Sequence, residues 1–250
     1  ALQIPMFGLY GACSTSGEAL ALASMSAAAG YGGTMIAVTS SHFGSAEKEF
    51  RFPLGYANQR PLSSHWTVTG SGAFLVQSAE EYRKQNTKSY FSNIRITGVT
   101  VGKIVDYGLK DSQNMGACMA PAAMDTIVQN FQDMERKEKD YDRIITGDLG
   151  SIGRTILFDL IREKGYDICE KHMDCGMTIF DKERQDTHAG GSGCGCAAVT
   201  LASYVLPKLE KGEWKRVLFV PTGALMSTVS FNEGASVPGI AHGIVLESDA

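Results

Sequence analysis

The stretch Gly11-Ala12-Cys13-Ser14-Thr15 decides how the rest of the chain is interpreted. It follows the apolar run 6–10, which predicts a buried strand, and it precedes the Ala- and Leu-rich segment 16–29, which predicts a buried helix. A thiol at a strand-to-helix turn lies beside backbone N–H groups and the positive end of the helix dipole. That position favours a thiolate, and the same N–H groups can bind an oxyanion or a carboxylate. The alternative is a buried cysteine that only packs.

Composition excludes several classes of protein. The chain has 250 residues, 44% of them hydrophobic, and a formal net charge of −4, which is typical of a globular protein with one large core or two halves. Phosphate binding needs a concentrated basic face, and the chain has no long basic run, so no nucleic-acid partner is expected. No stretch has the length of a membrane span, and no signal peptide precedes the first predicted strand.

Cysteine usage predicts a reducing, intracellular environment. Six cysteines in a chain of this length do not make a disulfide framework. Cys169 and Cys175 flank His172, but no second pair at matching spacing completes a zinc site, so no metal is expected there.

Strands alternate with helices along the chain, which predicts an α/β fold with mostly parallel strands. The expected helices are 16–29, one with Pro121 in its first turn after a loop 111–119, one capped by Ser151 that ends near residue 164, and 195–210. The expected strands are 6–10, 34–39 (covered on both faces), 73–76, 94–104 (or a hairpin), 143–146, 177–180, 216–222 and 240–247. The long irregular segment 43–66 predicts either a functional loop or a contact surface.

Four segments resemble the thiolase and ketoacyl-synthase superfamily. They are the Cys13 turn, the segment 59–61 followed by 69–73, the turn His188-Ala-Gly-Gly191 before an Ala-rich helix, and the last hairpin 239–247. In that superfamily the first turn carries the nucleophile and the second supplies a catalytic histidine. The resemblance therefore implies a layered fold of two related halves.

A larger set of motifs resembles the family of stage V sporulation protein AD: segments 9–15, 39–43, 50–54, 58–61 and 66–73. This resemblance implies a thiolase-like fold from which the N-terminal part of the first half is absent. Residues 1–92 would be the remainder of the N-terminal half and residues 93–250 the C-terminal half. It also implies binding of dipicolinic acid (pyridine-2,6-dicarboxylate) for uptake into the developing spore, membrane-embedded partners from the same operon, a homodimer, and an intracellular location peripheral to the spore inner membrane.

One departure from the superfamily pattern concerns Asp148. Ketoacyl synthases place a histidine after the strand that 143–146 matches, and here the nearest polar residue is Asp148. An ionised aspartate has no proton to give, so condensation, which needs donors for a developing oxyanion, is not expected. The alternative functions are an acyl-CoA condensing enzyme with Cys13 and His188 as catalytic residues, and a scaffold subunit that binds no ligand.

The expected ligand site reuses the nucleophile turn. The N–H groups near Cys13 would accept one carboxylate of dipicolinate, and His188, His42 and Arg60 are candidates for the other. For His42 and Arg60 the alternative is a structural hydrogen bond in the long loop. Asp148 would repel the ligand unless dipicolinate binds as its calcium chelate or Asp148 points elsewhere. No other cofactor is expected.

Overall fold

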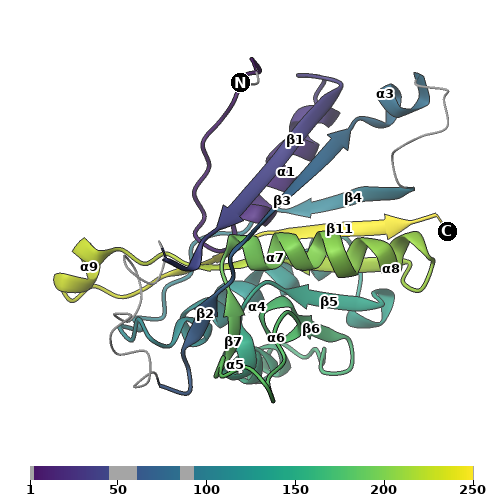
Figure 1. The fold of residues 1–250 in the computed structure, drawn as a ribbon. Coiled ribbons are helices and arrows are strands. Elements are labelled where there is room, and N and C mark those ends of the chain that lie inside the picture. The colour runs from purple at the N-terminus through teal and green to yellow at the C-terminus, as the bar shows by residue number, and fades with distance from the viewer. Residues whose placement is uncertain (1–2, 45–60, 85–92, 250) are drawn as a thin grey trace.

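The computed structural model describes residues 3–44, 61–84 and 93–249 (Figure 1). Most of the predicted loop 43–66, Arg60 included, lies outside these residues. Within the described ranges, none of the helices combines the length and the apolar character that crossing a bilayer requires.

A mixed five-stranded sheet forms the centre of the fold. Its order is β4 (Ile94–Thr100), β11 (Gly243–Ser248), β8 (Arg216–Val220), β5 (Arg143–Thr146) and β6 (His172–Asp174). Strands β8, β5 and β6 are parallel, whereas β11 runs antiparallel to both of its neighbours. The predicted α/β class is therefore confirmed, with parallel pairing limited to one side of the sheet.

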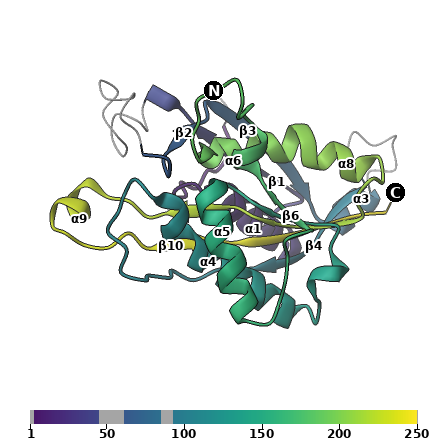
Figure 2. The same ribbon diagram turned by 90° about the horizontal axis from the view of Figure 1, so that it is seen from below.

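Helices cover both faces of this sheet, because the middle residues of its central strands are apolar and buried. Val217 and Phe219 pack against one layer, and Leu218 and Val220 pack against the other. The first layer contains α1 (Thr15–Ala28) and α7 (Cys194–Thr200), which continues through the π-helical segment Leu201–Val205 into α8 (Leu206–Glu210). The second layer contains α4 (Met115–Asp133) and α5 (Gly150–Glu163), seen from below in Figure 2.

A second, two-stranded sheet lies on the far side of α1. Strands β1 (Thr34–Ser41) and β3 (Gly70–Gln77) pair antiparallel, with Ile36 opposite Leu75. One face packs on α1, but Ile36 is 49% exposed and Val38 and Leu75 are each 58% exposed on the other. The prediction that 34–39 is covered on both faces is therefore wrong, because only one layer lies against this sheet in the described residues.

The predicted strand 6–10 is also wrong. Residues 3–10 are extended, yet no strand pairs with them in the described part of the chain, and Met6 and Phe7 are about nine-tenths exposed. Figure 1 shows this segment running apart from β1 and β3. An apolar run becomes a strand only where a neighbouring strand completes its hydrogen bonds.

The structure corrects three predicted elements near helix N-termini. Helix α4 begins at Met115, because the Asn114 side chain accepts a hydrogen bond from the backbone N–H of Ala117, so Pro121 lies inside the helix and 111–119 is not all loop. Helix α5 begins at Gly150 without a side-chain cap from Ser151. The predicted strand 177–180 is instead the helix α6 (Cys175–Thr178), capped by the Asp174 side chain.

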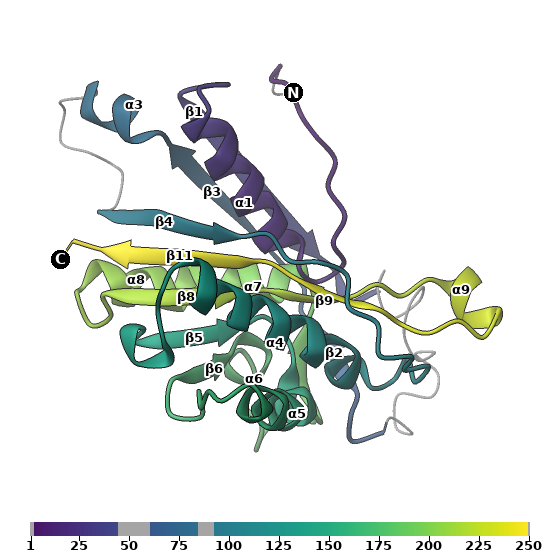
Figure 3. The ribbon, with the colours of Figure 1, turned by 180° about the vertical axis from the view of Figure 1, so that it is seen from behind.

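The remaining elements are short and connect the layers. Strand β2 (His65–Thr67) pairs in parallel with β7 (Gly190–Ser192), and β9 (Thr222–Ala224) pairs antiparallel with β10 (Gly239–Ala241). Figure 3 shows α9 (Thr228–Asn232) at the tip of a projection between β9 and β10. The other two are α3 (Ala79–Lys84) and the 3-10 helix η2 (Glu138–Asp140).

Gly102 provides a test of how tightly these elements pack. A Cβ at this position would lie 1.6 Å from the backbone oxygen of Ala241 in β10, which cannot rotate away. We expect Gly102→Ala to lower the free energy of unfolding by about 3 kcal/mol in urea denaturation, because backbone must move to admit the methyl group. Gly8→Ala is the matched control, since no atom lies within 4 Å of its Cβ position. Equal stability of the two variants would contradict this packing.

Candidate functional site

The Cys13 turn is closed by its own side chains. Ser14 Oγ donates to the Gly11 carbonyl oxygen at 2.6 Å, and Thr15 Oγ1 donates to the Ala12 carbonyl oxygen at 2.6 Å. Ala12 has a φ of +50°, in the left-handed region that costs a non-glycine residue about 1 kcal/mol. These contacts hold Cys13, which is partly exposed, two residues before the first residue of α1. The sequence therefore folds the turn as the motif predicts, although no strand precedes it.

Gly223 in β9 provides the surface on which this turn rests. A Cβ at Gly223 would lie 2.3 Å from the Gly11 carbonyl oxygen and 3.3 Å from the Cys13 nitrogen. Only a glycine allows two backbone segments to approach this closely. The contact places the Cys13 turn next to Thr222, which is fully buried.

Asp148 is buried at the point where four segments meet. It follows β5 and is 1% exposed. Its Oδ1 accepts a hydrogen bond from Thr222 Oγ1 at 2.9 Å, and its Oδ2 accepts one from the Gly193 N–H at 2.9 Å. The side chain of Cys13 is a third hydrogen-bonding partner. The structure thus brings together Cys13 and Asp148, two of the residues that sequence analysis selected.

The protonation of Asp148 is set mainly by burial. Burial raises the pKa of its carboxyl to about 6, and the negative charge of Asp174 acts in the same direction. The hydrogen bonds from Gly193, Cys13 and Thr222 oppose the increase because they stabilise the anion. Asp148 is therefore a group that gains or loses its proton close to neutral pH.

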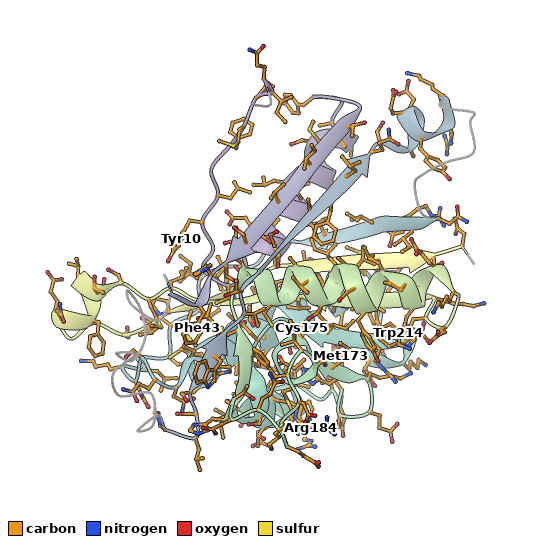
Figure 4. All side chains as sticks on the ribbon, viewed as in Figure 1. Tyr10, Phe43, Met173, Cys175, Arg184 and Trp214 are labelled. Atoms are coloured by element: carbon orange, nitrogen blue, oxygen red, sulfur yellow. The ribbon has the colours of Figure 1, made fainter. Side chains whose placement is uncertain are left out.

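Other titratable groups surround this pair. Burial raises the pKa of the Cys194 thiol, and the charge of Asp148 adds to that increase. Burial likewise raises the pKa values of the thiols of Cys175 and Cys196. Burial also raises the pKa of Tyr10, with the charges of Cys13 and Cys194 contributing. Figure 4 shows Tyr10 on the extended segment that leads into the Cys13 turn.

Glu18 adds one more acidic group on the first turn of α1. Its Oε2 would lie 2.9 Å from a Cβ at Gly11, and burial raises the pKa of the Glu18 carboxyl. A carboxylate here is attracted by the positive end of the α1 dipole. Glu18 therefore competes with any anionic ligand for the same end of the helix.

His188 is held by a different set of residues. Its Nδ1 lies 2.8 Å from the Pro61 carbonyl oxygen and 3.3 Å from Ser64 Oγ, and its Nε2 lies 3.0 Å from an Asp186 carboxylate oxygen. In the described residues these partners make no contact with the Cys13–Asp148 pair that the structure records. The glycine-rich turn reaches Asp148 through Gly193 instead, so a role for His188 in ligand binding stays a prediction.

Of the two loop candidates, the structure describes only His42. The Nδ1 of His42 accepts a hydrogen bond from the Gly44 N–H at 3.1 Å, which is the structural alternative considered for it. Arg60 lies outside the described residues. Both stay predictions as ligand residues.

No cation site is formed by the described ranges. In residues 3–44, 61–84 and 93–249, no three His, Cys, Asp or Glu side chains are grouped so that they could hold a metal ion. Cys175 is fully buried, and Cys169 instead accepts a hydrogen bond from Arg162 Nη2 at 2.9 Å.

Sequence reasoning did not select Thr222, Gly193 and Gly223, although all three shape the site. Each lies far along the chain from both Cys13 and Asp148, and hydrogen-bond partners at such separations leave no local pattern. The glycine-rich run 186–193 predicts a turn, but nothing in its pattern identifies the Gly193 N–H as a donor to Asp148.

Comparison with known proteins agrees with this geometry. The sequence profile of the family "Stage V sporulation protein AD" matches residues 1–247. The chain is 43% identical over 246 residues to the stage V sporulation protein AD of Bacillus subtilis (strain 168), covering 98% of this chain and 69% of that protein.

Solved structures share the fold at low identity. AbyA1, a tetronic acid condensing enzyme, superposes with a TM-score of 0.57 at 14% identity, over 95% of this chain and 66% of that one. The 3-oxoacyl-[acyl-carrier-protein] synthase III of Aquifex aeolicus VF5 gives 0.52 at 11% identity, over 94% and 65%. The chain thus spans about two thirds of the length of these proteins. The predicted thiolase-like fold is confirmed, and the chain belongs to the stage V sporulation protein AD family.

Proposed function

We propose that this sporulation protein binds dipicolinic acid at the Cys13 turn, for uptake of the acid into the developing spore. The observation that carries the proposal is the pairing of Cys13 with Asp148. The fold keeps a thiol at a helix N-terminus, as condensing enzymes do, but joins it to a buried carboxyl group in place of an imidazole. Such a site can hold an acid without the pair of imidazoles that condensation uses.

The geometry offers one carboxylate of the ligand a suitable place. Helix α1 has 14 residues, and the positive end of its dipole attracts an anion. The Cys13 thiol is a further weak donor. When Asp148 carries a proton it no longer repels the ligand, and its pKa of about 6 makes that protonation accessible. In this proposal a neutral Asp148 removes the repulsion between its carboxylate and the ligand. The two explanations considered in the sequence analysis, a bound calcium ion and an Asp148 side chain that points elsewhere, are then not needed.

We favour the form of dipicolinate without calcium. Calcium requires six to eight oxygen ligands, and both oxygens of Asp148 already accept hydrogen bonds from Thr222 and Gly193. To bind a cation, Asp148 would have to give up these donors in a site where it is almost fully buried.

Condensation is disfavoured by the same residue. An acyl-CoA condensing enzyme with Cys13 as nucleophile would need a donor for the developing oxyanion at the position of Asp148. An ionised carboxyl repels such a charge, and the His188 ring is hydrogen-bonded to residues 61, 64 and 186. The fold alone therefore does not argue for a condensing activity.

The assembly part of the proposal rests on exposed apolar surface. The outer face of the β1–β3 sheet and the unpaired segment 3–10 expose Ile36, Val38, Leu75, Met6 and Phe7. Exposed apolar patches of this kind mark contact surfaces. We assign them to a homodimer, with membrane-embedded proteins of the same operon as further partners and a location at the periphery of the spore inner membrane. A scaffold subunit without ligand would use the same surfaces.

Calorimetric titration of dipicolinate into the chain tests the binding proposal. At about pH 6 we expect binding by the wild type and a loss of about tenfold or more in affinity for Cys13→Ala, because one donor to the carboxylate is removed. Cys169→Ala is the matched control, since Cys169 contacts Arg162 and lies outside the site. We expect the control to bind as the wild type does.

Parallel titrations with added calcium and with a chelator complete this experiment. Equal affinity in both supports binding of the free acid. Tighter binding with calcium would restore the chelate as the ligand. No binding under either condition would refute the proposal and favour the scaffold.

A further inference from the structure

Asp174 is a second buried aspartate, which none of the preceding arguments uses. It ends β6, caps α6 and is 3% exposed. Figure 4 shows the next residue, Cys175, in the interior of the fold where α6 meets α7. An isolated buried carboxylate is costly, so the groups around it are informative.

Every close partner of the Asp174 carboxylate is a donor. Its Oδ2 accepts from Thr146 Oγ1 at 2.6 Å and from the Leu149 N–H at 2.9 Å. Its Oδ1 accepts from the Met177 N–H at 3.1 Å and from the Gly150 N–H at 3.2 Å. A protonated carboxyl would need an acceptor, and three of these four groups are backbone N–H donors that cannot accept. Burial raises the pKa of Asp174, but the hydrogen bonds around its carboxylate lower it and stabilise the ionised form.

The hydrogen bond from Thr146 to Asp174 is compatible with the other neighbour of the hydroxyl. His172 Nε2 lies 2.9 Å from Thr146 Oγ1. Burial lowers the pKa of His172 to about 3, with the charge of Arg154 contributing, so the ring is neutral. In the tautomer with the proton on Nε2, the ring donates to the hydroxyl, and the hydroxyl proton of Thr146 is available for Asp174.

We propose that Asp174 is the positioning residue of the Cys13–Asp148 site, holding as a buried anion the turn from which Asp148 reaches Cys13. Three of its four hydrogen bonds go to this turn: one to Thr146, which ends β5 before Asp148, and two to Leu149 and Gly150, which follow it. The turn is also sterically restricted, because Gly150 has a φ of +65° and a Cβ there would lie 2.6 Å from the Ala189 carbonyl oxygen. Asp148 itself makes no bond that fixes the backbone of the turn other than the 3.4 Å contact of its N–H with Thr222 Oγ1.

A fixed anion at this position also acts on Asp148 through its charge. The charge of Asp174 adds to the increase in the pKa of Asp148. A neutral residue that only held the turn by hydrogen bonds would leave the acidity of Asp148 unchanged. The titration of Asp148 therefore reports the charge of Asp174, and amide exchange at Leu149 and Gly150 reports its hydrogen bonds to the turn.

The test follows the ¹³Cγ resonance of Asp148 against pH, without ligand, in wild type and in Asp174→Asn. We expect the midpoint to fall by about 1 pH unit in the variant, and amide hydrogen exchange at Leu149 and Gly150 to accelerate. Asp142→Asn is the matched control, because Asp142 also accepts two backbone N–H bonds, from Lys215 and Arg216 beside β8. We expect the control to leave the Asp148 midpoint in place.

Two further measurements test the role of Asp174: amide exchange in Thr146→Val and dipicolinate affinity in Asp174→Asn. If Asp174→Asn does not fold, Thr146→Val removes one donor and keeps the anion; exchange at Leu149 should then accelerate, and Thr146→Ser should restore it. Dipicolinate affinity, which rests on the proposed function, should fall about tenfold in Asp174→Asn at about pH 4, where Asp148 is mostly protonated in both proteins. An unchanged Asp148 midpoint in Asp174→Asn, or unchanged exchange in Thr146→Val, would overturn the role of Asp174. Failure of the wild type to bind dipicolinate would overturn the proposed function and leave the ligand-free measurements as a valid test.

Discussion

Dipicolinate is expected to bind about tenfold more weakly for each pH unit above about 6, in calorimetric titrations at a series of pH values. The ligand is an anion, and an ionised Asp148 beside Cys13 repels it. A protonated Asp148 does not, so above the pKa of about 6 each bound ligand takes up one proton. One proton per ligand gives a slope of about one in the logarithm of Kd against pH.

The sign of this dependence follows from the state of the free protein. Below about pH 6 Asp148 already holds its proton, so ligand binding takes up no proton at this residue. The affinity then does not change with pH through Asp148. Above that pH the affinity falls until Asp148 also ionises in the complex. Heats measured in buffers of different ionisation enthalpy should report the same uptake of one proton.

Asp148→Asn should remove this dependence and bind about a hundredfold more tightly than the wild type at about pH 8, because the variant has no charge to neutralise. The amide fits the hydrogen bonds of the site. Its oxygen can accept from the Gly193 N–H, and its nitrogen can donate to the Thr222 hydroxyl, which can act as an acceptor.

Asp159→Asn is the control for charge, since the side chain of Asp159 is 69% exposed on α5. Its pH profile should coincide with that of the wild type. An Asp148→Asn variant that binds more weakly at alkaline pH would contradict the prediction and indicate a cation held by the carboxylate.

Much of the fold could be predicted from local pattern. The Ala-rich helix α1, the apolar strands β5 and β8 and the long helix that begins with α7 need only their own residues to be recognised. One error arises from a distant partner and another from a local cap. Residues 6–10 have the composition of a strand but no pairing partner in the described residues, and Met177 and Thr178 belong to α6, whose N-terminus Asp174 caps.

The site also combines residues that local sequence identifies with contacts that only the fold determines. Cys13 was selected by its turn, and Asp148 by a departure from the pattern of a superfamily, so both could be named without coordinates. Their pairing depends on Thr222, whose hydroxyl lies 2.9 Å from Asp148 although 74 positions separate them. A donor at that separation is assigned by the sheet, where β5 and β8 are neighbours, and not by any spacing in the sequence.

Gly223→Ala is expected to lower dipicolinate affinity by about a hundredfold or more while the protein remains folded. The new methyl group would lie 2.3 Å from the Gly11 carbonyl oxygen and 3.0 Å from the Ser14 nitrogen, all of it backbone that cannot rotate out of the way. The Cys13 turn must therefore move by roughly 1 Å from β9, and displacements of that size are enough to disable a preorganised site. Far-ultraviolet circular dichroism and calorimetric titration at about pH 6 would measure the two parts of this expectation.

The position of the strain makes this variant more informative than a change at Cys13 itself. Gly223→Ala leaves the thiol, Asp148 and Thr222 in the chain and alters only the distance between the turn and β9. Gly8→Ala is the control, because its Cβ would meet nothing within 4 Å on the same N-terminal segment, and it should bind as the wild type does. If Gly223→Ala bound dipicolinate with wild-type affinity, dipicolinate binding would not depend on the packing of the Cys13 turn against β9. Its binding site would then have to be sought elsewhere in the protein.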